Sequence, residues 1–170
     1  MLWLALAPLG AAADTLDDLF ARLADPNEAN WQTVAEDIEI QLAISGSASA
    51  DLLLRRGQAA LEEQDYAAAI DHLTALTDHA PEFAEGWNTR AAAYFLAGLY
   101  GPAMDDLRQV LVLEPRHWVA LAGLGMILEE LGETEAALAA FEAALAIHPH
   151  EPDIHAAAGR LRQSAGGTAL

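Results

Sequence analysis

The chain has 170 residues, of which 54% are apolar, so it can bury a core and is not disordered by composition. Its 26 acidic and 8 basic residues give a formal net charge of −18, which disfavours nucleic acids and anionic membranes as partners. The chain has no cysteine, which excludes disulfides and thiolate metal ligands.

Residues 1–13, MLWLALAPLGAAA, carry no charge and end in small residues. This pattern is typical of the apolar region and cleavage site of a secretory signal, although the basic residues that usually precede it are missing. The segment is shorter than the ~20 apolar residues that a membrane span needs, so we expect no stable membrane span. We predict a signal-peptide-like segment and a periplasmic or secreted protein, or a cytoplasmic one if the segment is not a signal.

Residues 14–45 predict a helical hairpin. Its first helix has one apolar face, formed by Leu16, Leu19, Phe20 and Leu23. Its second helix, residues 28–44, carries a second apolar face, formed by Trp31, Val34, Ala35, Ile38 and Leu42. We expect this hairpin to be an N-terminal cap that covers the unit following it in the chain.

Three consecutive units of 34 residues follow without a gap, at 50–83, 84–117 and 118–151. Each unit ends near a proline, and small residues recur at its eighth and twentieth positions. The prolines are Pro81, Pro115 and Pro149. The eighth position holds Gly57, Ala91 and Gly125, and the twentieth holds Ala69, Ala103 and Ala137. A break recurs in the middle of each unit, at Gln64, Gly98 and Gly132, where a left-handed backbone can end a helix. Each unit therefore predicts a helix, a tight turn and a second helix.

After the third unit, residues 152–163 predict a C-terminal capping helix. Pro152 suits the first helical turn, and Ile154, Ala157, Ala158 and Leu161 share the face expected to meet the third unit. Residues 164–170, SAGGTAL, predict a disordered tail.

The 34-residue period, the small residues and the terminal proline resemble the tetratricopeptide repeat (TPR) family, in particular small exported bacterial TPR proteins. The resemblance covers residues 50–151 and implies an all-α fold, a right-handed alpha-alpha superhelix (TPR solenoid) of three repeats between N- and C-terminal capping helices. Neighbouring hairpins in such a solenoid bury their apolar faces jointly. Arg56 and Arg90 depart from the family pattern, which usually has an apolar residue at their position.

In TPR proteins the first helix of each repeat lines a concave groove, so the resemblance also implies a partner-binding site. Its lining would be Leu54, Gln58, Leu61, Asn88, Phe95, Leu96, Val119 and Met126, with an acidic rim of Asp51, Glu62, Glu85, Glu129 and Glu130. This combination suits a protein or peptide segment that is apolar in the middle and basic at its flanks. TPR proteins that recognise a C-terminal carboxylate use groove cations, and none stands at these positions. Capping helices folded over the same apolar residues would be the alternative.

The sequence contains no glycine-rich phosphate loop, no G-x-S-x-G and no H-E-x-x-H. We therefore predict that the protein is not an enzyme and has no cofactor or small-molecule substrate. The favoured function is a non-catalytic protein–protein interaction scaffold or adaptor. His148, His150 and His155 are the best metal candidates, and we interpret them as exposed loop histidines without a metal. The alternative is a self-associating or metal-linked oligomerisation module built on these three residues.

Overall fold

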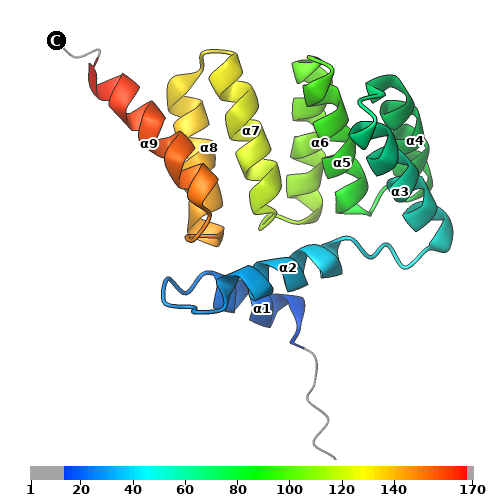
Figure 1. The fold of residues 1–170 in the computed structure, drawn as a ribbon, viewed down its shortest axis with the longest axis horizontal. Helices are drawn as coiled ribbons and strands as arrows, with labels where there is room; N and C mark the ends of the chain where they lie inside the picture. The colour runs from blue at the N-terminus through cyan, green and yellow to red at the C-terminus, as the bar shows by residue number, and fades with distance from the viewer. Residues whose placement is uncertain (1–13, 168–170) are drawn as a thin grey trace, which may run out of the picture.

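A computed structural model describes residues 14–167, and every regular element in that range is an α-helix (Figure 1). The helices are α1 (Leu16–Leu23), α2 (Trp31–Leu42), α3 (Ala48–Glu62), α4 (Tyr66–His79), α5 (Ala84–Leu96), α6 (Tyr100–Leu113), α7 (Trp118–Glu130), α8 (Thr134–Ile147) and α9 (Pro152–Gly167). The predicted all-α fold is confirmed. The predicted signal-like segment, residues 1–13, and the end of the predicted tail, residues 168–170, lie outside the described residues.

Three helical hairpins, α3–α4, α5–α6 and α7–α8, stand side by side in chain order (Figure 1). The turn within each hairpin has one residue with a left-handed backbone, and the φ angles are 60° at Gln64, 73° at Gly98 and 78° at Gly132. These are the three breaks predicted from the repeat. Past each turn a backbone N–H bonds back to a carbonyl of the first helix, as Leu99 does to Tyr94 at 2.8 Å.

The small residues at the eighth position of the repeats allow the two helices of a hairpin to approach closely. A Cβ atom built on Gly57 would lie 2.5 Å from Cγ of Leu73, and one built on Gly125 would lie 2.9 Å from a ring carbon of Phe141. Both partners are buried, so larger side chains at these glycines would force the helices apart.

Arg90, one of the two residues that depart from the repeat pattern, forms an ion pair between α5 and α6. Its Nε lies 2.7 Å from Oδ2 of Asp106, and its Nη2 lies 2.8 Å from Oδ1. Its Nη1 donates to Oγ1 of Thr77 at 2.7 Å, and its guanidinium lies 4.8 Å from the ring centroid of Trp87. The charge at a usually apolar position is thus accommodated by partners from three helices, whereas Arg56 is exposed.

The N-terminal hairpin α1–α2 lies elsewhere than predicted. It runs below the row of repeats (Figure 1), and its apolar face joins one core cluster with the third repeat and α9. That cluster includes Leu19, Phe20 and Ile38 together with Phe141 and Ile154. The prediction that this hairpin covers the first repeat is wrong. The linker before α3 turns at Gly46, whose φ of 74° favours glycine, and the hairpin reaches apolar surface left open at the other end of the array.

Contacts with the loop before α7 hold α1 in this place. Phe20 meets the ring of Trp118 edge-on, with 6.0 Å between centroids. The guanidinium of Arg116 lies 4.1 Å from the ring centroid of Phe20, and its Nη1 lies 2.7 Å from Oδ1 of Asp17. Apolar burial, a cation–π contact and an ion pair therefore converge on one loop.

A cluster of aromatic and histidine rings joins α2 to the loop before α9. Trp31 stacks on His150 with 5.5 Å between centroids, and Nε2 of His150 contacts the carbonyl oxygen of Asp25 at 2.8 Å. His148 lies edge-on to both Trp31 and Trp118, at 5.4 and 5.3 Å, and is 1% exposed. The interpretation of His148 as an exposed loop residue is wrong, because the hairpin covers it.

The last helix, α9, packs its predicted face against the third repeat, and Ile154, Ala157, Ala158 and Leu161 are buried. The helix continues to Gly167, past the predicted end at residue 163, so the predicted disordered tail begins too early. Across residues 14–167, no helix combines the length and apolar character that a membrane crossing requires.

Candidate partner-binding groove

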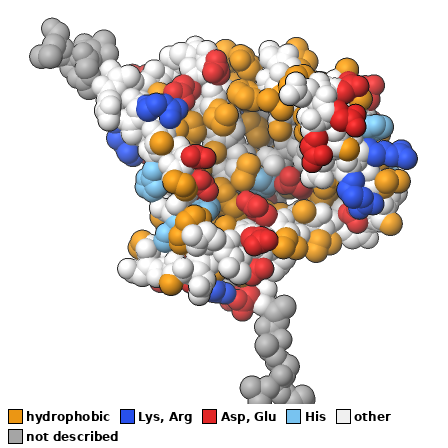
Figure 2. Space-filling model, in the orientation of Figure 1, with side chains coloured by type: hydrophobic (Ala, Val, Ile, Leu, Met, Phe, Trp, Pro, Cys, Tyr) orange, Lys and Arg blue, Asp and Glu red, His pale blue; other side chains and the backbone are white. Residues whose placement is uncertain are grey.

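The first helices of the repeats, with α2 and α9, surround a hollowed face on which apolar and acidic side chains lie close together (Figure 2). Three cavities open along this face, and Val119 of α7 lines all three. We name them the α5–α7 groove, the α7–α9 groove and the basal pocket.

The α5–α7 groove has a volume of about 360 Å³ and a lining that is apolar except for Asn88. It is lined by Asn88, Ala91, Ala92, Phe95, Leu96, Leu107, Val119, Ala122, Gly123, Met126 and Ile127. Among these, Leu96 is 51% exposed, Val119 41% and Met126 46%. Large apolar side chains are therefore presented to solvent along one strip.

The α7–α9 groove, of about 460 Å³, lies on the other side of α7 and shares Val119, Ala122 and Met126 with the first groove. Its far wall is the apolar face of α9, including Ile154, and its rim carries Glu129, which lies 3.5 Å from Nη2 of Arg160. The two grooves therefore share apolar residues of α7, whereas the α7–α9 groove also carries charged side chains, namely Glu39, Glu129, Glu151, Asp153 and Arg160.

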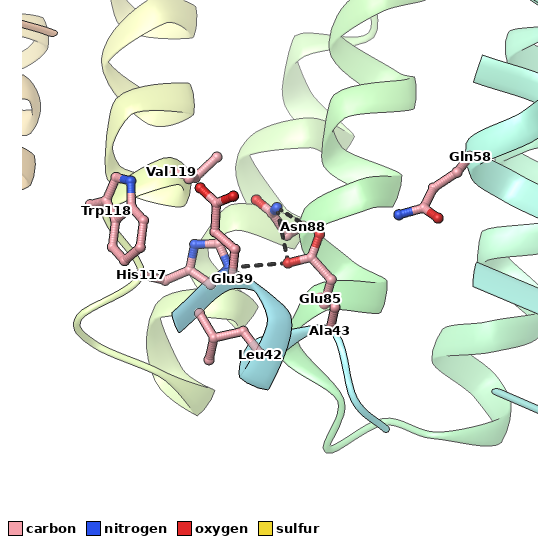
Figure 3. Close-up of a pocket in the computed structure, with 9 residues that line it drawn as sticks. All are labelled: Glu39, Leu42, Ala43, Gln58, Glu85, Asn88, His117, Trp118 and Val119. Atoms are coloured by element: carbon pink, nitrogen blue, oxygen red, sulfur yellow. Dashed lines mark hydrogen bonds and ion pairs between the residues drawn. The ribbon is translucent and has the colours of Figure 1, made fainter. Parts of the chain in front are cut away.

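The basal pocket, of about 360 Å³, lies where α2 passes beneath α5 and α7 (Figure 3). It is lined by Glu39, Leu42, Ala43, Gln58, Glu85, Asn88, His117, Trp118 and Val119. Asn88 and Val119 also line the α5–α7 groove, so the two cavities adjoin. The basal pocket depends on the position of the N-terminal hairpin, since α2 supplies Glu39 and Leu42 and the residue after it supplies Ala43.

The carboxylate of Glu85 is held in a fixed orientation at the pocket. It accepts hydrogen bonds from Nδ2 of Asn88 at 3.3 Å and from Oγ1 of Thr89 at 3.2 Å. Nε2 of His117 lies 3.3 Å away, and Nδ1 of the same ring accepts from the backbone N–H of Ala120 at 3.2 Å. Because Nδ1 is an acceptor, the ring proton lies on Nε2 and is donated to Glu85.

Glu39 faces the same pocket from α2, and no hydrogen bond or ion pair reaches its carboxylate from the described residues (Figure 3). Glu39 is exposed as a whole residue, but partial desolvation on its pocket side raises the pKa of its carboxyl group, and the negative charges of Glu85 and Glu151 raise it further. The pocket therefore brings together two carboxylates, one well bonded and one without a cationic partner.

The structure brings together only part of the predicted lining. Asn88, Phe95, Leu96, Val119 and Met126 meet in the α5–α7 groove, as predicted from their repeat positions.

The first repeat contributes little to this surface. Leu54 is 5% exposed and belongs to a core cluster that includes Ala93 of α5, so its assignment to the groove surface is wrong. It is buried because α3 packs against α5 as well as against α4. Leu61 packs half-buried on the same core, and Gln58 lines the basal pocket instead of the groove.

The predicted acidic rim is likewise divided. Glu85 belongs to the basal pocket and Glu129 to the α7–α9 groove. Asp51 accepts a hydrogen bond from Oγ of Ser45, which fixes the loop before α3. Glu62 and Glu130 are exposed and line none of the three cavities.

The contribution of α2 and the residue after it, namely Glu39, Leu42 and Ala43, was not predicted from the sequence. No signal within these residues identifies them, because their role depends on where the hairpin docks. The apolar face of α9 was identified, but only as packing surface, and the structure leaves part of it lining the α7–α9 groove.

The three candidate metal ligands do not converge. His148 is buried between tryptophans, and Nε2 of His155 contacts the carbonyl oxygen of Pro149 at 2.8 Å. Over the described part of the chain, no group of three or more His, Asp or Glu side chains is placed to hold a metal ion.

Family models for the tetratricopeptide repeat match residues 54–111 and 118–161. A TPR repeat-containing protein of Rhizobium etli is 39% identical over 137 residues, which are 79% of this chain and 66% of that protein. The chain thus spans slightly less than two thirds of the length of this relative.

Solved structures with the same fold include two TPR domains. The Sgt2 TPR domain from Aspergillus fumigatus aligns with a TM-score of 0.68 and 22% identity over 72% of this chain and 82% of that one. The first TPR of Spaghetti (RPAP3), bound to the HSP90 peptide SRMEEVD, aligns with a TM-score of 0.68 and 23% identity over 71% of this chain and 95% of that one. At these identities the likeness shows the fold alone. By its repeat spacing, its three stacked hairpins and these matches, the chain belongs to the tetratricopeptide repeat family.

Proposed function

We propose that the protein is a non-catalytic interaction module that binds a segment of a partner protein along the α5–α7 groove. The observation that carries this proposal is the strip of exposed apolar side chains, Leu96, Val119 and Met126, on the hollowed face of the array. Adjoining apolar side chains that stay in contact with water are typical of a surface that another molecule covers.

The charge around the groove favours a partner segment with basic flanks. Glu39 and Glu85 lie at its basal end, and Glu129 lies beyond Met126 on α7. The one arginine that lines any of these cavities, Arg160, lies 3.5 Å from Glu129 and is partly neutralised by it. An acidic segment such as the SRMEEVD peptide of the RPAP3 complex would meet repulsion here.

A selection from a display library of random peptides of about ten residues tests the proposal, with the full chain as bait. We expect the double variant Leu96→Ala with Met126→Ala to bind the selected peptides at least about tenfold more weakly than wild type, because both side chains line the groove. Both are exposed, so circular dichroism is expected to show unchanged helix content.

The matched control is Leu99→Ala with Leu131→Ala. These residues are 46% and 51% exposed and lie at the turns after α5 and α7, outside all three cavities. The control is expected to retain wild-type affinity. Equal affinity of the groove variant and wild type would place the binding surface elsewhere and refute the proposal.

A further inference from the structure

We propose that the basal pocket receives one basic side chain, an arginine guanidinium or a lysine ammonium, from the segment bound in the α5–α7 groove. The inference rests on the proposed function and adds a specificity site to it. The segment would carry apolar residues for the groove and, immediately beside them, one cation for the pocket.

The basal pocket is negatively charged. The titratable side chains in its lining are Glu39, Glu85 and His117, and Glu151 is near enough to add to the negative charge felt by Glu39. None of the chain's arginines lines the pocket. Glu39 is exposed as a whole residue, but its carboxylate has no cation beside it and feels the negative charges of Glu85 and Glu151, so a cation supplied by a ligand would be favourable here.

The two carboxylates of the pocket, Glu85 and Glu39, face the same space. Asn88, Thr89 and His117 hold Glu85 in place, and each carboxylate oxygen can accept more than one hydrogen bond. Glu39 faces the same space from α2 (Figure 3). A guanidinium or ammonium group entering between them would find a preoriented acceptor on one wall and an unpartnered one on the other.

The basal pocket adjoins the α5–α7 groove. Asn88 and Val119 line both the basal pocket and the α5–α7 groove, so a chain segment lying on Val119 can reach both. Trp118 and Leu42 provide apolar walls for the methylene groups that precede the charge in an arginine or lysine side chain. This geometry defines the order of the ligand: a cation next to apolar residues.

The display selection described above also tests this inference. Among peptides that need Leu96 and Met126, we expect one position to be enriched in Arg or Lys next to apolar residues. Resynthesis of the best peptide with citrulline at that position keeps the shape of arginine and removes its charge. We expect the citrulline peptide to bind wild type at least about tenfold more weakly, as measured by calorimetry.

Glu39→Gln tests the pocket itself, because it removes one charge while keeping the shape of a residue with no protein partner. In this variant the ratio of the affinity of the basic peptide to that of its citrulline version is expected to fall towards one. Asp37→Asn is the matched control, since it removes one negative charge from an exposed position of α2 that lies outside the pocket and is not among the charges that shift Glu39, and it should leave the ratio unchanged.

The outcomes separate the two proposals. If the selected peptides bind through the groove but show no preferred basic position, the basal-pocket proposal is refuted and the groove proposal stands. The same holds if Glu39→Gln leaves the ratio of the arginine-peptide affinity to the citrulline-peptide affinity unchanged. If the selected peptides bind the Leu96→Ala, Met126→Ala variant as tightly as wild type, the proposed function is refuted, and this inference with it. A higher affinity of the best lysine peptide over its arginine version would identify the ammonium as the preferred cation, and the reverse would identify the guanidinium.

Discussion

Asp106 carries a charge that the fold can accept only because Arg90 faces it. Its side chain is 6% exposed and that of Arg90 is 12% exposed, so neither charge is well solvated by water. The two hydrogen bonds between them are parallel, an arrangement that suits the planar guanidinium and would be lost with lysine.

We predict that Asp106→Ala lowers the free energy of unfolding by about 3 kcal/mol, because it leaves the Arg90 charge buried without its partner. Urea denaturation followed by circular dichroism measures the change. Asp105→Ala provides the control, since Asp105 pairs with Arg108 in an exposed position one residue away, and should cost under about 0.5 kcal/mol. Similar losses in the two variants would show that burial does not govern the Arg90–Asp106 pair.

At the level of the helices, the three hairpin turns share one geometry but not one residue type. Gly98 and Gly132 adopt positive φ without a side chain, whereas Gln64 adopts a φ of 60° with one. The backbone hydrogen bond that closes the turn is present in the first repeat as well, from Asp65 to Ala60 at 2.8 Å. The turn is therefore formed in spite of the strain on Gln64.

Gln64→Gly should increase the free energy of unfolding by about 1 kcal/mol, since glycine takes a left-handed backbone without a steric penalty. The reverse substitution, Gly98→Ala, is expected to cost about as much, and no atom lies within 4 Å of the added Cβ, so the effect isolates the backbone. Thermal unfolding of the Gln64→Gly and Gly98→Ala variants measures both changes in stability. A destabilised Gln64→Gly protein would contradict this account of the turn.

For the molecule as a whole, the position of α1–α2 changes the way the repeats depend on one another. A repeat array held only by neighbouring contacts can lose its end units separately. Here Asp17 and Arg116, which are 99 positions apart in sequence, are in contact, and one core cluster includes α1, α2, α8 and α9. The N-terminal hairpin and the third repeat should therefore unfold together.

His148 makes that docking sensitive to pH. Burial between Trp31 and Trp118, with a smaller contribution from the charge of His150, lowers the pKa of His148 from 6.5 to about 4. Between these values the unfolded chain binds a proton that the folded chain does not. The contribution of His148 to the free energy of unfolding is therefore fully present above about pH 6.5 and is lost as the pH drops towards about 4. The total loss across this window is about 3 kcal/mol.

Urea unfolding at intervals from pH 7 to pH 4, with hydrogen exchange of α1–α2 as a local readout, measures this loss. We expect His148→Leu to have a shallower pH dependence than wild type over this window. His72→Leu, which alters a histidine of α4 away from the hairpin, should keep the wild-type slope. The same slope in wild type and His148→Leu would exclude His148 as the origin.

The features that were predicted from the sequence are those set by short-range spacing. The turns at Gln64, Gly98 and Gly132 follow from a 34-residue period, and the groove positions of Phe95 and Met126 follow from their places within one helix. The site of hairpin docking could not be predicted, because an apolar face such as that of Leu19 and Phe20 fits many surfaces equally well. Glu39 was missed for the same reason, since it joins the pocket only after α2 has docked.

The return of α1–α2 to the third repeat also sets an order of events during synthesis. The ribosome makes the hairpin before its binding surface on α7, α8 and α9. In the interval, Leu19, Phe20 and Ile38 remain uncovered while the first two repeats can already close on each other. The hairpin thus reaches its final place only after α9, which follows it in the chain, has been made, and a ribosome-bound chain ending before residue 118 would expose the hairpin to chaperones.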